Sequence, residues 1–266
     1  MTRIAVIGGG TMGATFIRAV TDAGLVATSS LSVCEIVDER RKWLEREFNG
    51  LNVTAALSEA VDGSDAVYLS VKPQDLGSLS DGAGTDSRLL ISILAGSTIA
   101  EVQRSTGARR IVRAMPNTPA QIGRGFTAWT ATERVTADDR RLVGSLLDTM
   151  GEQLYVPDES TIDKITAVSG SGPAYVFLFI EAMINAAVQV GLRPDDARRM
   201  VLQTVIGAAE FAAQSGQHPA ALKDMVTSPG GTTAAGLRVL EQRALRAALI
   251  DAVAAAHQRA EELGSS

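Results

Sequence analysis

The chain has 266 residues, of which 45% are apolar, so it is long enough for one or two domains with substantial cores. Its net charge is −5, and the parts up to and beyond Pro157 carry −2 (16 basic and 18 acidic residues) and −3 (9 and 12), which argues against nucleic acid or an anionic membrane as the main partner. Cys34 is the only cysteine and we find no secretory leader pattern, so we expect a cytoplasmic protein without disulfides.

Short β-type runs alternate with helical patterns from residue 1 to 157. We predict strands at 4–7, 31–37, 66–71, 89–94, 110–114, 125–130 and 153–156. The runs are almost continuously apolar, as in a sheet that is covered on both faces, and helical patterns such as 11–23 and 98–105 lie between several of them. This alternation predicts an α/β domain over residues 1–157 with a Rossmann-like, doubly wound sheet.

A glycine-rich turn, GGGTMG, follows the first predicted strand and opens the first predicted helix. In this context Gly8 permits the tight turn, Gly10 lets the backbone approach a pyrophosphate, and Gly13 lets helix and strand pack closely. The first helical residues, Thr11 and Met12, lie where a helix offers free N–H groups and its positive dipole end to phosphates. The turn therefore predicts a dinucleotide-binding site.

An acidic residue, Asp38, ends the second predicted strand, 25 residues after Gly13. In the dinucleotide fingerprint such an acid binds the ribose 2′-hydroxyl, which favours NAD(H). Arg40 and Arg41 follow at once and suit a 2′-phosphate, which favours NADP(H). A third interpretation makes Asp38 the cap of a helix that begins at Glu39, with both arginines in solvent. The residues leave all three interpretations open.

Three further segments end or follow predicted strands and belong at the same edge of the sheet, where open α/β sheets bind their ligands. They are the run Ser70, Val71, Lys72 and Pro73, the pair Ala95 and Gly96, and the loop MPNTP, which contains Asn117. Lys72 is either a group that faces cofactor or substrate or a plain surface lysine. Two prolines stiffen the loop around Asn117, which favours a side-chain amide held in one place.

Strand patterns end at Asp158, and long alanine-rich helical segments follow at 171–190, 194–214 and 232–263. We predict an all-helical domain over residues 158–266. Its most apolar stretch, 174–190, is too short for a membrane span, and its polar residues Glu181, Asn185 and Gln189 form one stripe. We expect a helix that is buried on most sides, and covering it requires a second chain, which predicts at least a dimer.

Two motifs of this half combine hydroxyl groups with glycines. SGSGPAY at 169–175 opens the apolar helix and suits a carboxylate or a nicotinamide amide, although an ordinary serine cap explains it as well. In VTSPGGTT at 226–233 the two glycines present consecutive N–H groups to an anion. No metal-ligand spacing and no catalytic Tyr-Lys or His-Asp pair stands out, so we expect no metal. Hydroxyls and N–H groups suit hydride addition to an iminium ion, which creates no alkoxide to protonate.

The motifs GGGTMG, VKPQ at 71–74, MPNTP at 115–119, SGSGPAY and LKDMVTSPGGTT at 222–233 together resemble the pyrroline-5-carboxylate reductase family in order and spacing, over essentially the whole chain. The resemblance implies reduction of 1-pyrroline-5-carboxylate to L-proline by NADPH or NADH, at the end of proline biosynthesis. It also implies a helical C-terminal domain that dimerises by intertwining, active sites that draw on two chains, and dimers that commonly assemble into decamers.

The resemblance also assigns roles by position. Thr233 would be the catalytic group that hydrogen-bonds the ring nitrogen, and the carboxylate would be held by Ser228 and the backbone of Gly230, Gly231 and Thr232. The cofactor would be lined by Ser70, Val71, Lys72, Pro73, Ala95, Gly96 and Asn117. Many members carry an Asn-Arg-type pair where this chain has Asp38 and Glu39, so Asp38→Asn would shift preference towards NADPH if Asp38 faces the ribose.

Two other classes compete with this interpretation. A β-hydroxyacid dehydrogenase of similar build needs a catalytic lysine in the helix between its domains, and residues 171–190 contain none. A non-enzymatic dinucleotide sensor would keep the glycine-rich turn but has no need of the SPGGTT run.

Overall fold

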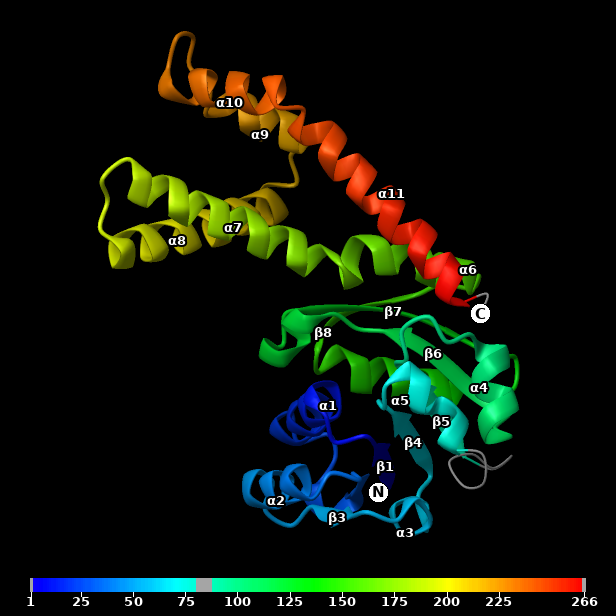
Figure 1. The fold of residues 1–266 in the computed structure, drawn as a ribbon. Helices are drawn as coiled ribbons and strands as arrows, with labels where there is room; N and C mark the ends of the chain where they lie inside the picture. Colours follow the sequence, from blue (N-terminus) through cyan, green and yellow to red (C-terminus); the bar gives the residue numbers. More distant parts are fainter. Residues whose placement is uncertain (1, 80–87, 265–266) are drawn as a thin grey trace. The chain divides into compact units, whose positions relative to one another are not determined.

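The computed structural model describes residues 2–79 and 88–264, and the chain divides into two compact units (Figure 1). The first unit runs up to Ser171 and includes the segment from Ala256 onward, and the second comprises Gly172–Ala255. Helix α6 (Ser160–Ile165) and the π-helical turn Thr166–Gly170 therefore belong to the first unit. The two units thus divide after Ser171, later in the chain than the predicted division at residue 157.

The first unit is built on an eight-stranded sheet with the order β3-β2-β1-β4-β5-β6-β7-β8. Its strands are β1 (Ile4–Ile7), β2 (Leu31–Cys34), β3 (Asn52–Thr54), β4 (Ala66–Leu69), β5 (Leu89–Ser92), β6 (Arg110–Met115), β7 (Gly125–Ala131) and β8 (Gly151–Tyr155). Strands β1 to β6 pair in parallel, and β7 is antiparallel to β6. The order reverses at β1, so the glycine-rich turn lies at the switch point where such sheets bind ligands. The predicted fold class is confirmed.

Helices and short 3₁₀ turns connect these strands. The helices of the first unit are α1 (Thr11–Asp22), α2 (Asp38–Glu47), α3 (Leu57–Val61), α4 (Ile99–Thr106), α5 (Ala137–Asp148) and α6. Strands β2, β4 and β5 end two or three residues earlier than predicted, because their apolar runs continue into the loops after ladder pairing stops. The short strand β3, at the edge of the sheet, was not predicted.

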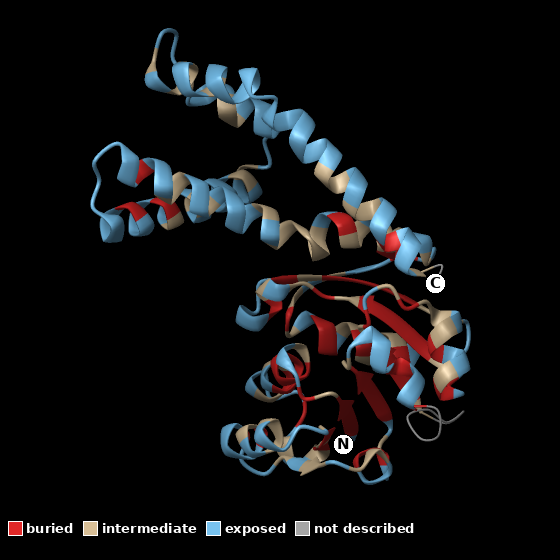
Figure 2. Ribbon diagram, in the orientation of Figure 1, coloured by how far each residue is buried: buried red, intermediate tan, exposed pale blue. Residues whose placement is uncertain are grey.

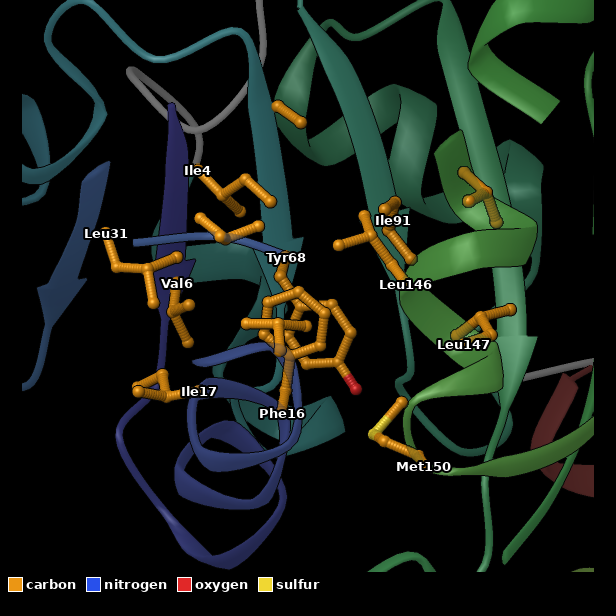
Figure 3. Packing of buried hydrophobic residues seen from close by; sticks show 14 of the residues in the cluster. Ile4, Val6, Phe16, Ile17, Leu31, Tyr68, Ile91, Leu146, Leu147 and Met150 are labelled. Carbon is orange, nitrogen blue, oxygen red and sulfur yellow. The ribbon is translucent and has the colours of Figure 1, made fainter. Parts of the chain in front are cut away.

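The core of the sheet anchors helix α1. Figure 3 shows the Phe16 ring on that of Tyr68, with ring centroids 3.9 Å apart and an interplanar angle of 8°. Both side chains are fully buried, and burial raises the pKa of the Tyr68 phenol. This stacked pair holds α1, which begins at the glycine-rich turn, against β4.

The second unit contains helices only, as predicted. They are α7 (Gly172–Gln189), α8 (Pro194–Ser215), α9 (Pro219–Met225), α10 (Thr232–Gln242) and α11 (Leu245–Gly264), whose last turns belong to the first unit. The predicted single helix 232–263 is broken at Ala244, where φ is 56°. The alanine-rich sequence favours helix on both sides and carries no glycine or proline there to mark the break.

Apolar side chains lie exposed throughout the second unit. Within residues 172–255 only Ala187, Ala197 and Val201 are buried, and Figure 2 shows these helices mostly in the exposed colour, with intermediate stretches between. On α7, Phe177 is 60% and Leu178 66% exposed, so burial of this helix on most sides is not found within one chain. The helical stretch Ser160–Gln189 is longer than the predicted segment 174–190. By length and composition alone it is long and apolar enough to cross a membrane.

Candidate functional site

Two glycines of the turn after β1 are required by close backbone approaches. Gly8 has a φ of 97°, and a Cβ added to it would lie 2.7 Å from the carbonyl oxygen of Ser70. A Cβ added to Gly13 would collide with the Gly8 carbonyl oxygen and lie 2.9 Å from Ser70 Oγ. Any larger residue at either position would push the turn away from the end of β4.

Gly10 leaves room on the open side of the turn. A Cβ added to Gly10 would meet no protein atom within 4 Å. Gly10 is the N-cap of α1 and provides no side-chain cap, and the Ala14 N–H is the one that donates to its carbonyl oxygen, at 3.0 Å. The N–H groups of Thr11, Met12 and Gly13 thus precede the helical hydrogen-bond ladder. Open space beside a helix N-terminus fits a dinucleotide pyrophosphate.

Ser70 ties this turn to the end of β4. Its N–H donates to the carbonyl oxygen of Ile7 at 2.8 Å, and its hydroxyl donates to that of Gly8 at 2.8 Å. The chain continues through half-buried Val71 to exposed Lys72, which lies directly before the 3₁₀ helix Pro73–Leu79. The first of the predicted strand-end segments is therefore brought to the glycine-rich turn.

The pair after β5 borders a cavity in the first unit. The cavity has a volume of about 540 Å³, and its lining includes Pro73, Ala95, Gly96 and Leu263. Gly96 has a φ of 75°, and a Cβ added to it would lie 2.9 Å from the Cβ of Leu263. The turn after β5 thus needs glycine for its backbone conformation, and the end of α11 lies against it.

The side-chain amide of Asn117 is fixed by three hydrogen bonds. Its Nδ2 donates to the carbonyl oxygen and to the hydroxyl of Ser169, both at 3.1 Å, and its Oδ1 accepts from the Phe126 N–H at 2.9 Å. Asn117 therefore joins the MPNTP loop to the π-helical turn in which the SGSG motif begins. The predicted rigidity of the loop comes from these bonds as well as from its prolines.

The acid beside the glycine-rich turn is Glu35, which the sequence interpretation missed. Strand β2 ends at Cys34, and the Glu35 carboxylate accepts from the N–H of Gly9 at 3.0 Å and from that of Val37 at 2.9 Å. Glu35 lies 22 residues after Gly13, close to the spacing of the dinucleotide fingerprint. The apolar Ile36 and Val37 extended the predicted strand past it.

Asp38 begins helix α2 instead of ending a strand. Its carboxylate pairs with Lys42 at 2.8 Å and with Arg41 at 3.0 Å, and these cations hold its pKa below the usual value. The side chain is 61% exposed, and the N-cap of α2 is Val37, so Asp38 is not the cap of its helix either. We compared Asp38 and Glu39 with the family's Asn-Arg-type pair, but the two positions that follow β2 directly hold Glu35 and Ile36.

Both predicted arginines of this segment contact backbone carbonyls. Arg40 donates from Nε to the carbonyl oxygen of Gly9 at 2.6 Å, and its guanidinium lies over the Trp43 ring at 3.9 Å. Arg41 donates from Nη1 to the carbonyl oxygens of Glu35 and Ile36, at 2.9 and 2.8 Å. The interpretation in which both arginines are simply solvated does not hold, because Arg40 ties α2 to the turn after β1 and Arg41 ties it to the turn after β2.

A buried ion pair network was also missed. The Arg113 side chain on β6 is 3% exposed, and its guanidinium contacts Glu159 Oε1 at 3.0 Å and Asp163 Oδ1 at 2.6 Å. Glu159 Oε1 also accepts from the N–H of Ile99 at 2.8 Å. One arginine thus connects the sheet, helix α6 and the start of α4. Nothing local in the sequence predicts partners that lie 46 and 50 residues away.

The glycine and hydroxyl groups of VTSPGGTT form the turn between α9 and α10. Gly231 is the N-cap of α10, its N–H donates to the Ser228 carbonyl oxygen at 3.1 Å, and Gly230 has a φ of 71°. Thr232 and Thr233 are the first two residues of the helix, so neither is its cap. This turn lies in the second unit, whereas the predicted cofactor residues lie in the first. Within residues 2–79 and 88–264, no three His, Cys, Asp or Glu side chains gather as in a metal site.

Comparisons with known proteins divide the chain in a similar way. Residues 159–263 match the family model for pyrroline-5-carboxylate reductase dimerisation, and residues 3–96 match that for NADP oxidoreductase, coenzyme F420-dependent. The pyrroline-5-carboxylate reductase of Synechocystis is 40% identical over 264 residues, with 98% of each chain covered. That of Escherichia coli is 37% identical over 269 residues, with 99% of each chain covered.

Solved structures agree with these relatives. A pyrroline-5-carboxylate reductase from Coxiella burnetii has a TM-score of 0.87 and 35% identity, with 100% of this chain and 99% of that one covered. The Plasmodium falciparum pyrroline carboxylate reductase with NADP bound has a TM-score of 0.89 and 31% identity, with 99% and 98% covered. The present chain therefore belongs to the pyrroline-5-carboxylate reductase family.

Proposed function

We propose that this protein reduces 1-pyrroline-5-carboxylate to L-proline by hydride transfer from NADH or NADPH, at the end of proline biosynthesis. The observation that carries the proposal is the combination, in one chain, of an open glycine-rich turn at a helix N-terminus with a Gly-Gly hydroxyl turn at the start of α10. The first suits a dinucleotide and the second a small carboxylate.

The first unit binds the cofactor in this proposal. The backbone around Gly10 and the N–H groups of Thr11 and Met12 hold the pyrophosphate, while Ser70 keeps the turn against β4. The rest of the dinucleotide is lined by Val71, Lys72, Pro73, Ala95 and Gly96, with Asn117 holding the neighbouring loop. The bound dinucleotide supplies the hydride, and these residues hold the dinucleotide in place.

The turn before α10 binds the substrate. Its carboxylate is held by the Ser228 hydroxyl and the N–H groups of Gly230, Gly231 and Thr232, and Thr233 hydrogen-bonds the ring nitrogen. Hydride addition neutralises the positive charge of a protonated imine, so the site requires no acid to protonate a developing alkoxide. A site of hydroxyls and backbone N–H groups is sufficient for this chemistry.

An assay of NAD(P)H oxidation tests the activity directly. We expect turnover with pyrroline-5-carboxylate and none with simple 2-keto acids, nor reduction of NAD(P)⁺ by 3-hydroxy acids. Equal turnover of a hydroxy acid would instead support a β-hydroxyacid dehydrogenase. Binding of a dinucleotide without turnover of any of these compounds would support a sensor.

We further propose that the chain acts in the cytoplasm as at least a dimer through residues 159–263, and that its dimers assemble further, up to decamers. The support is the match to a dimerisation domain together with exposed apolar residues such as Phe177 and Leu178 on α7. Light scattering at micromolar concentration should give at least twice the chain mass of 27.8 kDa. A mass of one chain would contradict the assembly and any site shared between chains.

A further inference from the structure

The carboxylate of Glu35 is held directly beside the glycine-rich turn. Cys34 pairs with Ile7 in the sheet, and its carbonyl oxygen accepts from the Gly8 N–H at 2.9 Å, so the chain after β2 runs next to the turn after β1. Gly9 donates to one carboxylate oxygen of Glu35 and Val37 to the other. An ionised carboxylate accepts about four hydrogen bonds, so acceptor sites remain on both oxygens.

The cations near Glu35 are engaged by the protein itself. Arg40 donates to the carbonyl oxygens of Gly9 and Gly10, and Arg41 donates to two carbonyls after β2 and to Asp38. The side chains that follow Glu35 are apolar and exposed, with Ile36 at 80% and Val37 at 53%. This end of the cofactor site therefore presents a fixed carboxylate and two side chains that cannot donate a hydrogen bond.

We infer that this chain prefers NADH to NADPH and that Glu35, not Asp38, determines the preference. The inference rests on the dinucleotide site of the proposed function, in which the acid after the second strand meets the ribose 2′ position. A 2′-hydroxyl donates a charge-assisted hydrogen bond to a carboxylate. A 2′-phosphate, with a charge of about −1.5 to −2 at neutral pH, is repelled by it and meets no side-chain donor at Ile36 or Val37.

Dissociation constants of the oxidised dinucleotides test the inference without turnover. Isothermal titration of the purified full chain with NAD⁺ and with NADP⁺ should show NAD⁺ bound at least about tenfold more tightly, a ratio typical of one differing charged contact. Glu35→Gln keeps the side-chain size and one acceptor oxygen, and should reduce this ratio about tenfold, mainly through tighter NADP⁺ binding.

Asp38→Asn is the matched control, because it removes the same charge three residues further along the chain. Its ratio should equal that of the wild type, since Asp38 is paired with Arg41 and Lys42. Wild-type protein that binds NADP⁺ as tightly as NAD⁺ would overturn the inference, whether or not the Glu35 variant folds. A shift in Asp38→Asn as large as in Glu35→Gln would overturn the role of Glu35. Failure of the folded wild type to bind either dinucleotide would instead refute the proposed function.

Discussion

Replacing Thr233 by valine should lower turnover with pyrroline-5-carboxylate by about ten- to a hundredfold, while the cofactor affinity and the melting temperature stay near those of the wild type. Valine keeps the shape of the side chain and removes the hydroxyl that we assign to the ring nitrogen. Losing one such contact in a site amounts to about 1–3 kcal/mol. Steady-state kinetics, dinucleotide titration and thermal unfolding on one preparation check the three expectations together.

The competing explanation, that Thr233 caps its helix, is disfavoured because Gly231 is the N-cap of α10 and Thr233 is the second helical residue. Thr227→Val provides the control. The Thr227 hydroxyl donates to the carbonyl oxygen of Lys223 at 2.6 Å, so its loss should lower the melting temperature and leave turnover per folded molecule nearly unchanged. Full activity in a folded Thr233→Val protein would show that Thr233 is not a catalytic residue.

Replacing Arg113 by methionine should destabilise the protein by about 3–5 kcal/mol, the range seen when one partner of a buried ion pair is removed. The substitution leaves the carboxylates of Glu159 and Asp163 without their cation, and the side chains of these residues are only 33% and 15% exposed. This guanidinium links β6 to Glu159 and to Asp163 of α6. Urea unfolding, at one protein concentration because assembly affects the midpoint, measures the loss.

Arg141→Met serves as the control for the removal of an ion pair. Arg141 pairs with Asp138 on the surface of α5, where the two side chains are 73% and 83% exposed. Exposed pairs contribute at most about 1 kcal/mol, so this variant should unfold close to the wild type. Equal midpoints for the two variants would show that burial of the Arg113 network does not stabilise the fold.

Local features were predicted well from the sequence. The turn GGGTMG could be recognised because a positive φ at Gly8 and a close approach at Gly13 are requirements that particular residue types meet. The strands of the first half are short and apolar, and the helices between them are periodic, so the doubly wound sheet followed from pattern alone. Among the five motifs, SGSGPAY and LKDMVTSPGGTT were the most specific for the family assignment, which the relatives confirm.

The contacts of individual side chains were harder to predict. Ile36 and Val37 are β-branched and extended the expected strand, but β2 ends at Cys34, the last residue that pairs with β1. The end of a strand depends on the hydrogen bonds of its neighbour, so only the folded sheet shows that Glu35 lies beside the turn and that Asp38 belongs to α2. The same is true of Arg113, whose partners are distant in the sequence.

The sequence by itself determined the class of this protein: a dinucleotide-binding sheet, a helical second half, and the motifs of one reductase family, because each depends on residue types at short spacings. Only the tertiary structure decided which acid lies beside the glycine-rich turn and which arginine binds the backbone carbonyls of that turn. It also decided that the apolar α7 stays exposed in a single chain. These properties depend on contacts between distant segments, and for α7 on surface that one chain does not provide.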